Sequence, residues 1–307
     1  MPLSDANHAT SAVAAALDIG SNTIKLTVAR IGDGGIDELF SRSDTVRLSL
    51  GLDRTGRMAD DRVEAAMATL HEFVGLARDA GATTILAVAT EAIRVAANGP
   101  DVRARIEQEL GITIELISGD READLTFLGV MAGTDPAGDL VLADIGGAST
   151  ELIVATDGER RFSRSLPIGS GRMSDRHVRT DPPTVDELAA VRADVVETVQ
   201  TLGLPPVSHA RMLIVGGTGE FLFRLAPEGV TTTSPAILEA MVARMTTIPA
   251  LELTTLIAIP EARARVLPAG ATVALGIADV VGPLTVSAGP SGIRLGLLME
   301  LSRGITA

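Results

Sequence analysis

The sequence contains no cysteine, tryptophan or tyrosine, and six phenylalanines are its only aromatic residues. The absence of cysteine excludes disulfides, thiol catalysis and cysteine-ligated metals. So few aromatic side chains also argue against the stacking platforms that bind single-stranded nucleic acid. Basic residues are scarce too, since 26 Lys and Arg face 39 Asp and Glu, a formal net charge of −13. We therefore expect no nucleic-acid partner, and any polyanion must be bound locally, by a metal ion, backbone amides or a confined group of arginines.

Long apolar runs and a secretory signal are also missing. No stretch reaches about 18 uninterrupted apolar residues, so the sequence predicts no transmembrane helix and no membrane partner. Residues 1–11 carry neither Lys nor Arg and no separate apolar segment, which is unlike a signal peptide. We expect them to form a flexible tail and the protein to be cytoplasmic. With 46% apolar residues, the 307-residue chain can build an aliphatic core in one large or two ordinary domains.

A gapless internal repeat organises the chain. Residues 18–29 (DIGSNTIKLTVA) match residues 144–155 (DIGGASTELIVA) at six of twelve positions. Each copy follows an apolar strand and leads through a glycine-containing turn into a second strand, so the repeat predicts two β-hairpin meanders; chance similarity between two glycine turns is the alternative. Helical periodicity in segments such as 60–80 and 184–202 predicts crossover helices. We expect two α/β lobes that divide near residues 126–137, with a cleft lined by both Asp-Ile-Gly turns.

Three turns of small residues follow predicted strands and can present converging N–H groups to phosphate oxygens. They are Gly20-Ser21-Asn22, Gly146-Gly147-Ala148-Ser149 and Gly216-Gly217-Thr218. The third also begins a predicted helix, whose N-terminus adds positive potential. A tight hairpin or a helix start is the structural alternative for each turn taken alone.

Acidic residues stand beside these turns. Asp18 and Asp144 end the repeated strands, where a phosphate would repel them unless a divalent cation lies between. Glu151 can return to the same turn along the hairpin, so Asp144 and Glu151 are a candidate Mg²⁺ pair, with turn capping as the alternative. One carboxylate of residues 117–124 (ISGDREAD) could act as a general base, but the pattern does not choose between Glu122 and its neighbours, and acids there also complement the helix macrodipole.

Two groups of arginines are candidates for contacting an anion. Arg94, in the segment ATEAIR, could clamp a phosphate through its guanidinium fork, or pair with Glu91 on the surface. Six arginines also fall between Arg160 and Arg179, together with His177. They could meet a polyanion or form a solvated surface.

Together these segments resemble the exopolyphosphatase/guanosine pentaphosphate phosphohydrolase (Ppx/GppA phosphatase) family. The matching strings are LDIGSNTIKL, ATEAIRVAANG, IELISGDREADL, LADIGGASTEL, SLPIGSGR, VGGTGEFL and GIRLGLL, and they extend from about residue 12 to 301. The resemblance implies an α/β protein of the actin and sugar-kinase superfamily, with two duplicated actin-like (ribonuclease H-like) lobes, residues 12–126 and 127–307. It implies Mg²⁺-dependent hydrolysis of the terminal phosphoanhydride of inorganic polyphosphate. Guanosine pentaphosphate is an alternative substrate; a non-catalytic polyphosphate or nucleotide sensor and a sugar-type kinase are alternative functions.

The resemblance also implies residue roles. Glu122 would activate the attacking water, and Asp144 and Glu151 would lie beside Mg²⁺. The remaining matched positions would contact the anionic substrate: Ser21, Asn22, Arg94, Gly146, Gly147, Ser149, Gly217 and Thr218. Three positions differ from the usual family residues, namely Arg121, Ala148 and Leu295, and a positive φ at Ala148 would strain its loop. Exposed apolar helix faces lead us to expect a homodimer.

Overall fold

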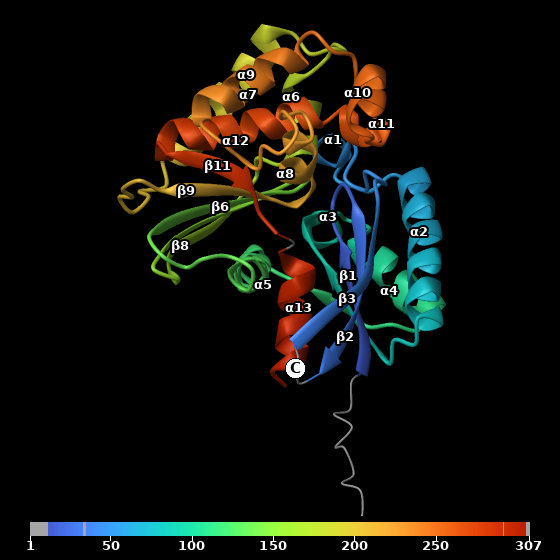
Figure 1. Cartoon of the computed structure of the whole chain (residues 1–307). Coiled ribbons are helices and arrows are strands. Elements are labelled where there is room, and N and C mark those ends of the chain that lie inside the picture. Colours follow the sequence, from blue (N-terminus) through green and yellow to red (C-terminus); the bar gives the residue numbers. More distant parts are fainter. Residues whose placement is uncertain (1–11, 33–34, 291, 305–307) are drawn as a thin grey trace, which may run out of the picture.

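The computed structural model describes residues 12–32, 35–290 and 292–304, and Figure 1 shows two α/β lobes. The tail expected at residues 1–11 lies outside the described residues. The sheet of the first lobe has the strand order β3-β2-β1-β4-β5. Its strands are β1 (Ala12–Ile19), β2 (Ile24–Gly32), β3 (Gly35–Asp44), β4 (Thr84–Ala89) and β5 (Ile114–Leu116). Strands β1 to β3 form an antiparallel meander, and β4 and β5 run parallel to β1.

The second sheet repeats this arrangement in the order β8-β7-β6-β9-β11, with β10 added at the edge. Its strands are β6 (Asp139–Ile145), β7 (Thr150–Thr156), β8 (Glu159–Leu166), β9 (Arg211–Val215), β10 (Thr232–Thr233) and β11 (Thr285–Ala288). The register shifts between Val28 and Ala29 in the first meander and between Val154 and Ala155 in the second, which are equivalent positions of the repeat. The repeat and the two duplicated α/β lobes predicted from the sequence are therefore confirmed.

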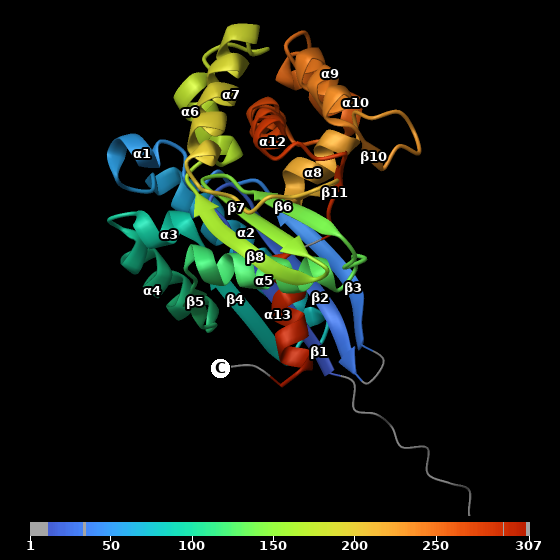
Figure 2. The ribbon, with the colours of Figure 1, turned by 90° about the vertical axis from the view of Figure 1, so that its left-hand side faces the viewer.

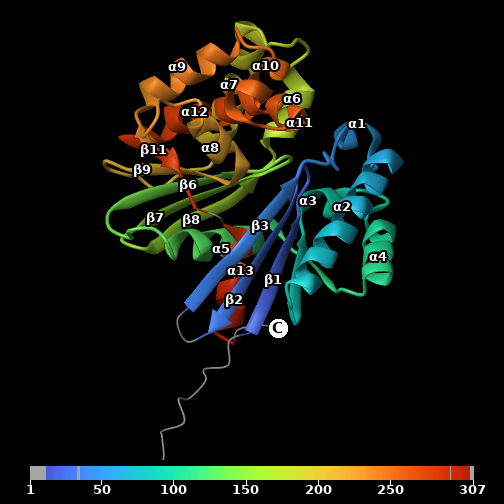
Figure 3. The same ribbon diagram turned by 45° about the vertical axis from the view of Figure 1, so that its right-hand side comes forward.

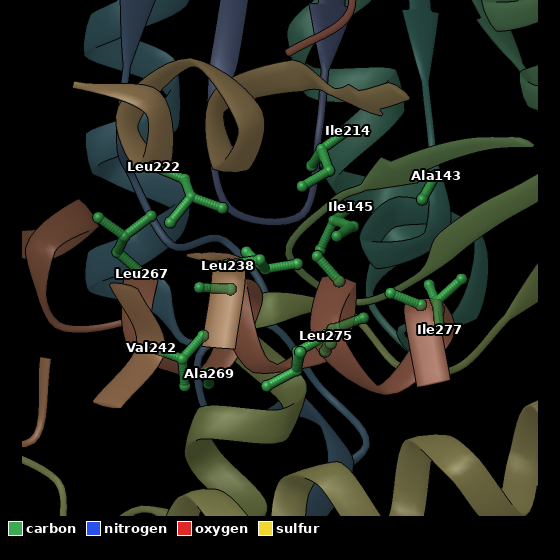
Figure 4. Close-up of a cluster of buried hydrophobic side chains, with 14 of the residues drawn as sticks. Ala143, Ile145, Ile214, Leu222, Leu238, Val242, Leu267, Ala269, Leu275 and Ile277 are labelled. Carbon is green, nitrogen blue, oxygen red and sulfur yellow. The ribbon is translucent and has the colours of Figure 1, made fainter. Parts of the chain in front are cut away.

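Helices cover the outer faces of both sheets (Figure 3). In the first lobe these are α1 (Leu52–Thr55), α2 (Asp60–Asp79), α3 (Glu91–Val95) and α4 (Gly99–Leu110). In the second lobe they are α6 (Ser170–His177), α7 (Val185–Gln200), α8 (Gly216–Phe223), α9 (Pro235–Met245), α10 (Ala250–Ile257), α11 (Glu261–Ala264) and α12 (Leu267–Val281). The core beneath them is aliphatic: Leu275 and Ile277 of α12 belong to the same buried cluster as Ile145 of β6 and Ile214 of β9 (Figure 4). Residues 261–281 are long and apolar enough to span a membrane, but 78% of their apolar window is buried inside the fold, as in a core helix.

Two further helices, α5 (Gly119–Met131) and α13 (Ile293–Ser302), lie next to each other between the two sheets (Figures 1 and 2). Ala123 and Val130 of α5 are buried with side chains of the second sheet, whereas Leu125 is buried with α13 and the first sheet. The absence of a side chain at Gly129 allows the helices to approach closely: a Cβ there would lie 2.2 Å from the carbonyl oxygen of Gly292. The sequence-based division assigns 293–302 to the second lobe, while α13 packs on the first sheet.

Candidate active site between the lobes

The two Asp-Ile-Gly turns meet at the interface between the lobes. In both turns the glycine amide bonds to a carbonyl three residues later, Gly20 to Thr23 and Gly146 to Ser149. A Cβ at Gly147 would lie 2.4 Å from Cβ of Asn22, so the loops touch. They enclose a cavity of about 50 Å³, which at roughly 10–15 Å³ per water holds only a few waters or one small anionic group. The lining includes the predicted residues Ser21, Asn22, Glu122, Asp144, Gly146, Gly147, Ser149, Glu151 and Gly217.

The carbonyls of the second loop are anchored on the start of α6. Gly146 accepts from the amide of Ser170 at 2.8 Å, Gly147 from that of Arg172 at 2.9 Å, and Ala148 from that of Gly169 at 3.2 Å. In a trans peptide the C=O and the following N–H point in opposite directions. The amides of residues 147–149 therefore face away from α6, and none of them donates a hydrogen bond within the described part of the chain. Such a group of free amides is suited to phosphate oxygens.

The first loop is fixed in a similar way. The Asn22 carbonyl accepts from the amide of Arg47 and the Ser21 carbonyl from that of Ser49, both at 2.9 Å. The hydroxyl of Ser21 accepts from the amide of Ala92 at the start of α3. Both loops are thus anchored by backbone hydrogen bonds to neighbouring segments of their own lobes.

The repeat places two cross-strand pairs beside the cavity, and their charges differ. Asp18 is opposite Lys25 in the first copy, and Asp144 is opposite Glu151 in the second. Burial, with the negative charge of Asp144, raises the pKa of Glu151 to about 8. Burial raises the pKa of Asp18 as well, although Lys25 opposes that shift. Within the described part of the chain neither Asp144 nor Glu151 forms an ion pair, although Lys25 also lines the cavity, and two such carboxyl groups are the ligands that a divalent cation would favour.

Glu122 is positioned by the first turn of α5. The helix begins at Ser118, whose hydroxyl accepts from the amide of Arg121 at 3.1 Å. The Glu122 side chain is 7% exposed. Burial, followed by the charges of Glu151, Asp18 and Asp144, raises its pKa well above the ordinary value for glutamate. A buried carboxylate with a raised pKa at a cavity is suited to accepting a proton near neutral pH.

Buried polar atoms without partners concentrate at this cavity. They include Asp18 Oδ1, Asn22 Nδ2, Thr23 Oγ1, Glu122 Oε2 and Arg263 Nε, all from residues that line it. Folded proteins leave few such atoms unpaired unless water, an ion or a ligand occupies the site. The concentration of donors and acceptors at one place therefore indicates a polar ligand.

The donor set fits Mg²⁺ with substrate rather than a fully formed protein cage. Among the described residues, no three carboxylates or imidazoles converge to hold a metal ion by themselves. Mg²⁺ is commonly held by one or two carboxylates and completes its shell with waters and substrate phosphates. Asp144 and Glu151 supply such a pair, and Thr126 orients Asp144 by donating to its Oδ2 at 3.0 Å.

Two predicted residues lie outside the cavity lining. Arg94 donates to the Ile117 carbonyl at 2.5 Å, although its charge still lowers the pKa of Glu122 against the larger effect of burial. Thr218 is buried and donates to the Ile145 carbonyl at 3.2 Å. Both residues therefore support the walls of the site in this structure.

Sequence reasoning missed two cations of the lining, Lys25 and Arg263. Lys25 is the only lysine in the chain, and it occupies the repeat position of Glu151, which is a signal that the sequence offers. Arg263 is 5% exposed, and burial lowers its pKa to about 10. No side chain or carbonyl of the described residues accepts a hydrogen bond from it, and a Cβ at Gly217 would lie 2.4 Å from its Nη2. No sequence pattern distinguishes Arg263 from its neighbour Arg265; only the burial of Arg263 in the folded structure does.

The three departures from the usual family residues do not disturb the cavity. Arg121 points to α13, where it forms a two-fold hydrogen bond with Glu300 at 2.6 Å for both contacts. Ala148 is absent from the residues with positive φ, so the strain considered for this position does not arise. Leu295 does not line the cavity.

Two larger hollows adjoin the cavity. A hollow of about 970 Å³ meets it at Ala148 and has six arginines and three aspartates in its lining. Arg172, Arg176 and Arg179 belong to it, whereas Arg160 and Arg161 lie elsewhere, so the arginine group predicted from the sequence is divided. A second hollow, of about 470 Å³, shares Lys25 and Arg263 with the cavity and includes Phe221.

Comparisons with known proteins agree with this geometry. The sequence profile of the Ppx/GppA phosphatase family matches residues 27–303. Exopolyphosphatase 1 of Mycobacterium leprae is 31% identical over 300 residues, which cover 92% of this chain and 88% of that protein. Exopolyphosphatase 2 of Mycobacterium tuberculosis is 32% identical over 235 residues, 73% of either chain. The solved structure of an Aquifex aeolicus Ppx/GppA family member has a TM-score of 0.77 and 26% identity, covering 97% of this chain and 100% of that one.

Proposed function

The chain belongs to the Ppx/GppA phosphatase family and is a phosphoanhydride hydrolase, and from this premise we propose that it is an exopolyphosphatase that releases orthophosphate from the end of inorganic polyphosphate with Mg²⁺. The observation that carries the proposal is the small cavity between two loops, lined by a loop with free amides and by Glu122. A cavity of about 50 Å³ has room for one small anionic group such as a terminal phosphoryl group, and the adjoining hollows leave space for the rest of a chain.

In this proposal the amides of residues 147–149 bind the oxygens of the terminal phosphoryl group. Glu122 takes a proton from a water, whose oxygen bonds to the terminal phosphorus as the bond to the bridging oxygen breaks. The products are orthophosphate and a chain shortened by one unit. Mg²⁺, held through Asp144 and Glu151, would neutralise charge on the phosphate oxygens. Positioning and charge stabilisation supply most of the catalysis in such reactions.

Phosphate release from polyphosphate, measured with Mg²⁺ and with excess chelator, tests the proposal. We expect release of single phosphates that depends on Mg²⁺ and is weakened by Asp144→Asn. Absence of phosphate release, or release of internal fragments, would contradict it. A homodimer and a cytoplasmic location remain predictions from the sequence, and sedimentation and cell fractionation would test them.

Guanosine pentaphosphate is a second candidate substrate because of the 470 Å³ hollow. Ligand pockets for small molecules commonly measure roughly 300–1,000 Å³, and this one contains Phe221, whose ring lies 5.8 Å from the guanidinium of Arg263. In a chain with six phenylalanines as its only aromatics, an aromatic ring in this hollow favours a stacked base, which would compete for the ring with the Arg224 guanidinium that lies 4.6 Å from its centre. Competition between guanosine pentaphosphate and polyphosphate would measure which substrate is preferred. Phe221→Leu should weaken binding of guanosine pentaphosphate and leave binding of polyphosphate unchanged.

A further inference from the structure

The side chain of Arg172 joins three segments that are far apart in the sequence. Its Nε and Nη2 donate to the two oxygens of Asp53 at 2.9 Å each. Its Nη1 donates to Glu91 at 2.9 Å and to the carbonyl of Ala148 at 2.7 Å. Asp53 and Glu91 belong to the first lobe, whereas Ala148 is in the second phosphate-binding loop. One guanidinium therefore ties that loop to the opposite lobe.

The Arg172 guanidinium and its contact with Glu91 are more enclosed than an ordinary surface ion pair, whereas Asp53 is exposed. The Arg172 side chain is 10% exposed and Glu91 is 12% exposed, against 57% for Asp53. A second ion pair also crosses between the lobes, from Arg47 to Asp175 at 3.0 Å, but Asp175 is 39% exposed. Exposed pairs contribute little, and enclosed hydrogen-bonded charges contribute more. Arg172 is thus the stronger of these two connections.

Arg172 does not enter the cavity itself. It lines the 970 Å³ hollow, and Ala148 is the residue that the hollow and the cavity share. The guanidinium therefore lies on the side of the loop that faces the 970 Å³ hollow, away from the cavity. Its backbone amide also holds the carbonyl of Gly147, so this one residue fixes two successive peptides whose free amides face away from α6.

We propose that Arg172 is a positioning residue, which sets the second phosphate-binding loop against the first lobe and so makes the geometry of the cavity depend on closure of the two lobes. The inference rests on the proposed function for the identity of the reaction. If the lobes separate, Arg172 must leave either Asp53 and Glu91 or the Ala148 carbonyl. In the second case the Ala148 carbonyl loses one of its two hydrogen bonds, which allows this loop to shift, and displacement of about 1 Å at a reacting group can cost roughly 10²-fold in rate.

The test compares Arg172→Ala and Arg172→Lys with Arg192→Gln, a matched control on α7 whose guanidinium also donates to an aspartate and a glutamate, Asp279 and Glu239, and which lines neither hollow. We expect Arg172→Ala to lower kcat on polyphosphate by about 10- to 100-fold while KM changes less than about threefold. Arg172→Lys, which keeps the charge but not the fork, should recover part of kcat. The control should stay within twofold of wild type in both.

Hydrogen exchange gives a readout that does not require activity. In Arg172→Ala we expect faster exchange confined to the amides whose hydrogen bonds anchor the loop, those of Gly146, Gly169 and Ser170. Asp53→Asn, an exposed change that should fold normally, should lower kcat less and should not add to the effect of Arg172→Ala. Wild-type kcat in Arg172→Ala, fully additive effects, or faster exchange throughout the protein would overturn the proposal. If wild-type protein releases no phosphate, the proposed function fails, while the exchange result still tests the positioning role.

Discussion

Individual residues at the cavity carry charges that their environment makes sensitive to pH. Because burial and Asp144 raise the pKa of Glu151 to about 8, Glu151 holds a proton at neutral pH when no cation is bound. Mg²⁺ binding must displace that proton, so the affinity should rise with pH. We expect the apparent Kd for Mg²⁺ to fall by up to about tenfold per pH unit below pH 8 and to level off above it.

Isothermal titration with Mg²⁺ between pH 6 and 9 checks this expectation. Glu151→Gln should give a shallower dependence on pH, and Asp144→Asn should weaken binding at every pH because a formal charge is lost. Equal affinities at pH 6 and pH 9 in the wild-type protein would show that no carboxyl group titrates on binding.

Ala148 provides a second test at the scale of one residue. Its φ is not positive, so replacement by glycine relieves no strain and only adds freedom to the unfolded chain. We expect Ala148→Gly to keep kcat within about twofold and to lower the free energy of unfolding by roughly 0.4–1 kcal/mol. Phosphate release and urea unfolding measure the two quantities, and a severalfold gain in kcat would mean that the methyl group obstructs the substrate.

At the scale of elements, α5 carries Glu122 and is held by α13. Arg121 and Glu300 connect the helices through two hydrogen bonds at 2.6 Å, with exposures of 32% and 15%. A partly enclosed two-fold pair of this kind should have a coupling energy of about 1 kcal/mol. A double-mutant cycle of Arg121→Ala and Glu300→Gln, followed by urea unfolding, measures it. Strict additivity would show that the pair does not fasten α5.

The elements also show what could be predicted from the sequence. Both hairpin meanders followed from the repeat, because their turns are closed by local bonds such as Gly146 to Ser149. Helix α6 was not predicted: residues 170–177 are polar, include Gly171, and have Met173 as their only large apolar residue. It forms where its first amides bind the carbonyls of residues 146–148, a tertiary contact that no local pattern records. The burial of Arg263 and the contacts of Arg172 with the first lobe could not be predicted for the same reason, because both depend on tertiary contacts.

At the scale of the whole molecule, the net charge of −13 limits the number of contacts with a long polyanion. Affinity for such chains grows with the number of phosphates neutralised. The cavity, its cations and the arginine-lined hollow offer only a few local contacts. We expect short polyphosphates to be cleaved at least as well, per molecule, as chains of hundreds of units, with release of the shortened chain between turnovers. Product lengths from end-labelled chains under excess substrate check this, and complete degradation of some chains while most remain intact would contradict it.

The most direct test of the central claim, that Glu122 acts as the base at the cavity between the lobes, is turnover by Glu122→Gln measured together with binding. The change keeps the shape of the side chain and removes its capacity to accept the proton. We predict a loss in kcat of about 10² to 10⁴, while the Kd for fluorescently labelled polyphosphate stays within about threefold of wild type. A variant that binds polyphosphate and retains more than half of the wild-type kcat would contradict the account.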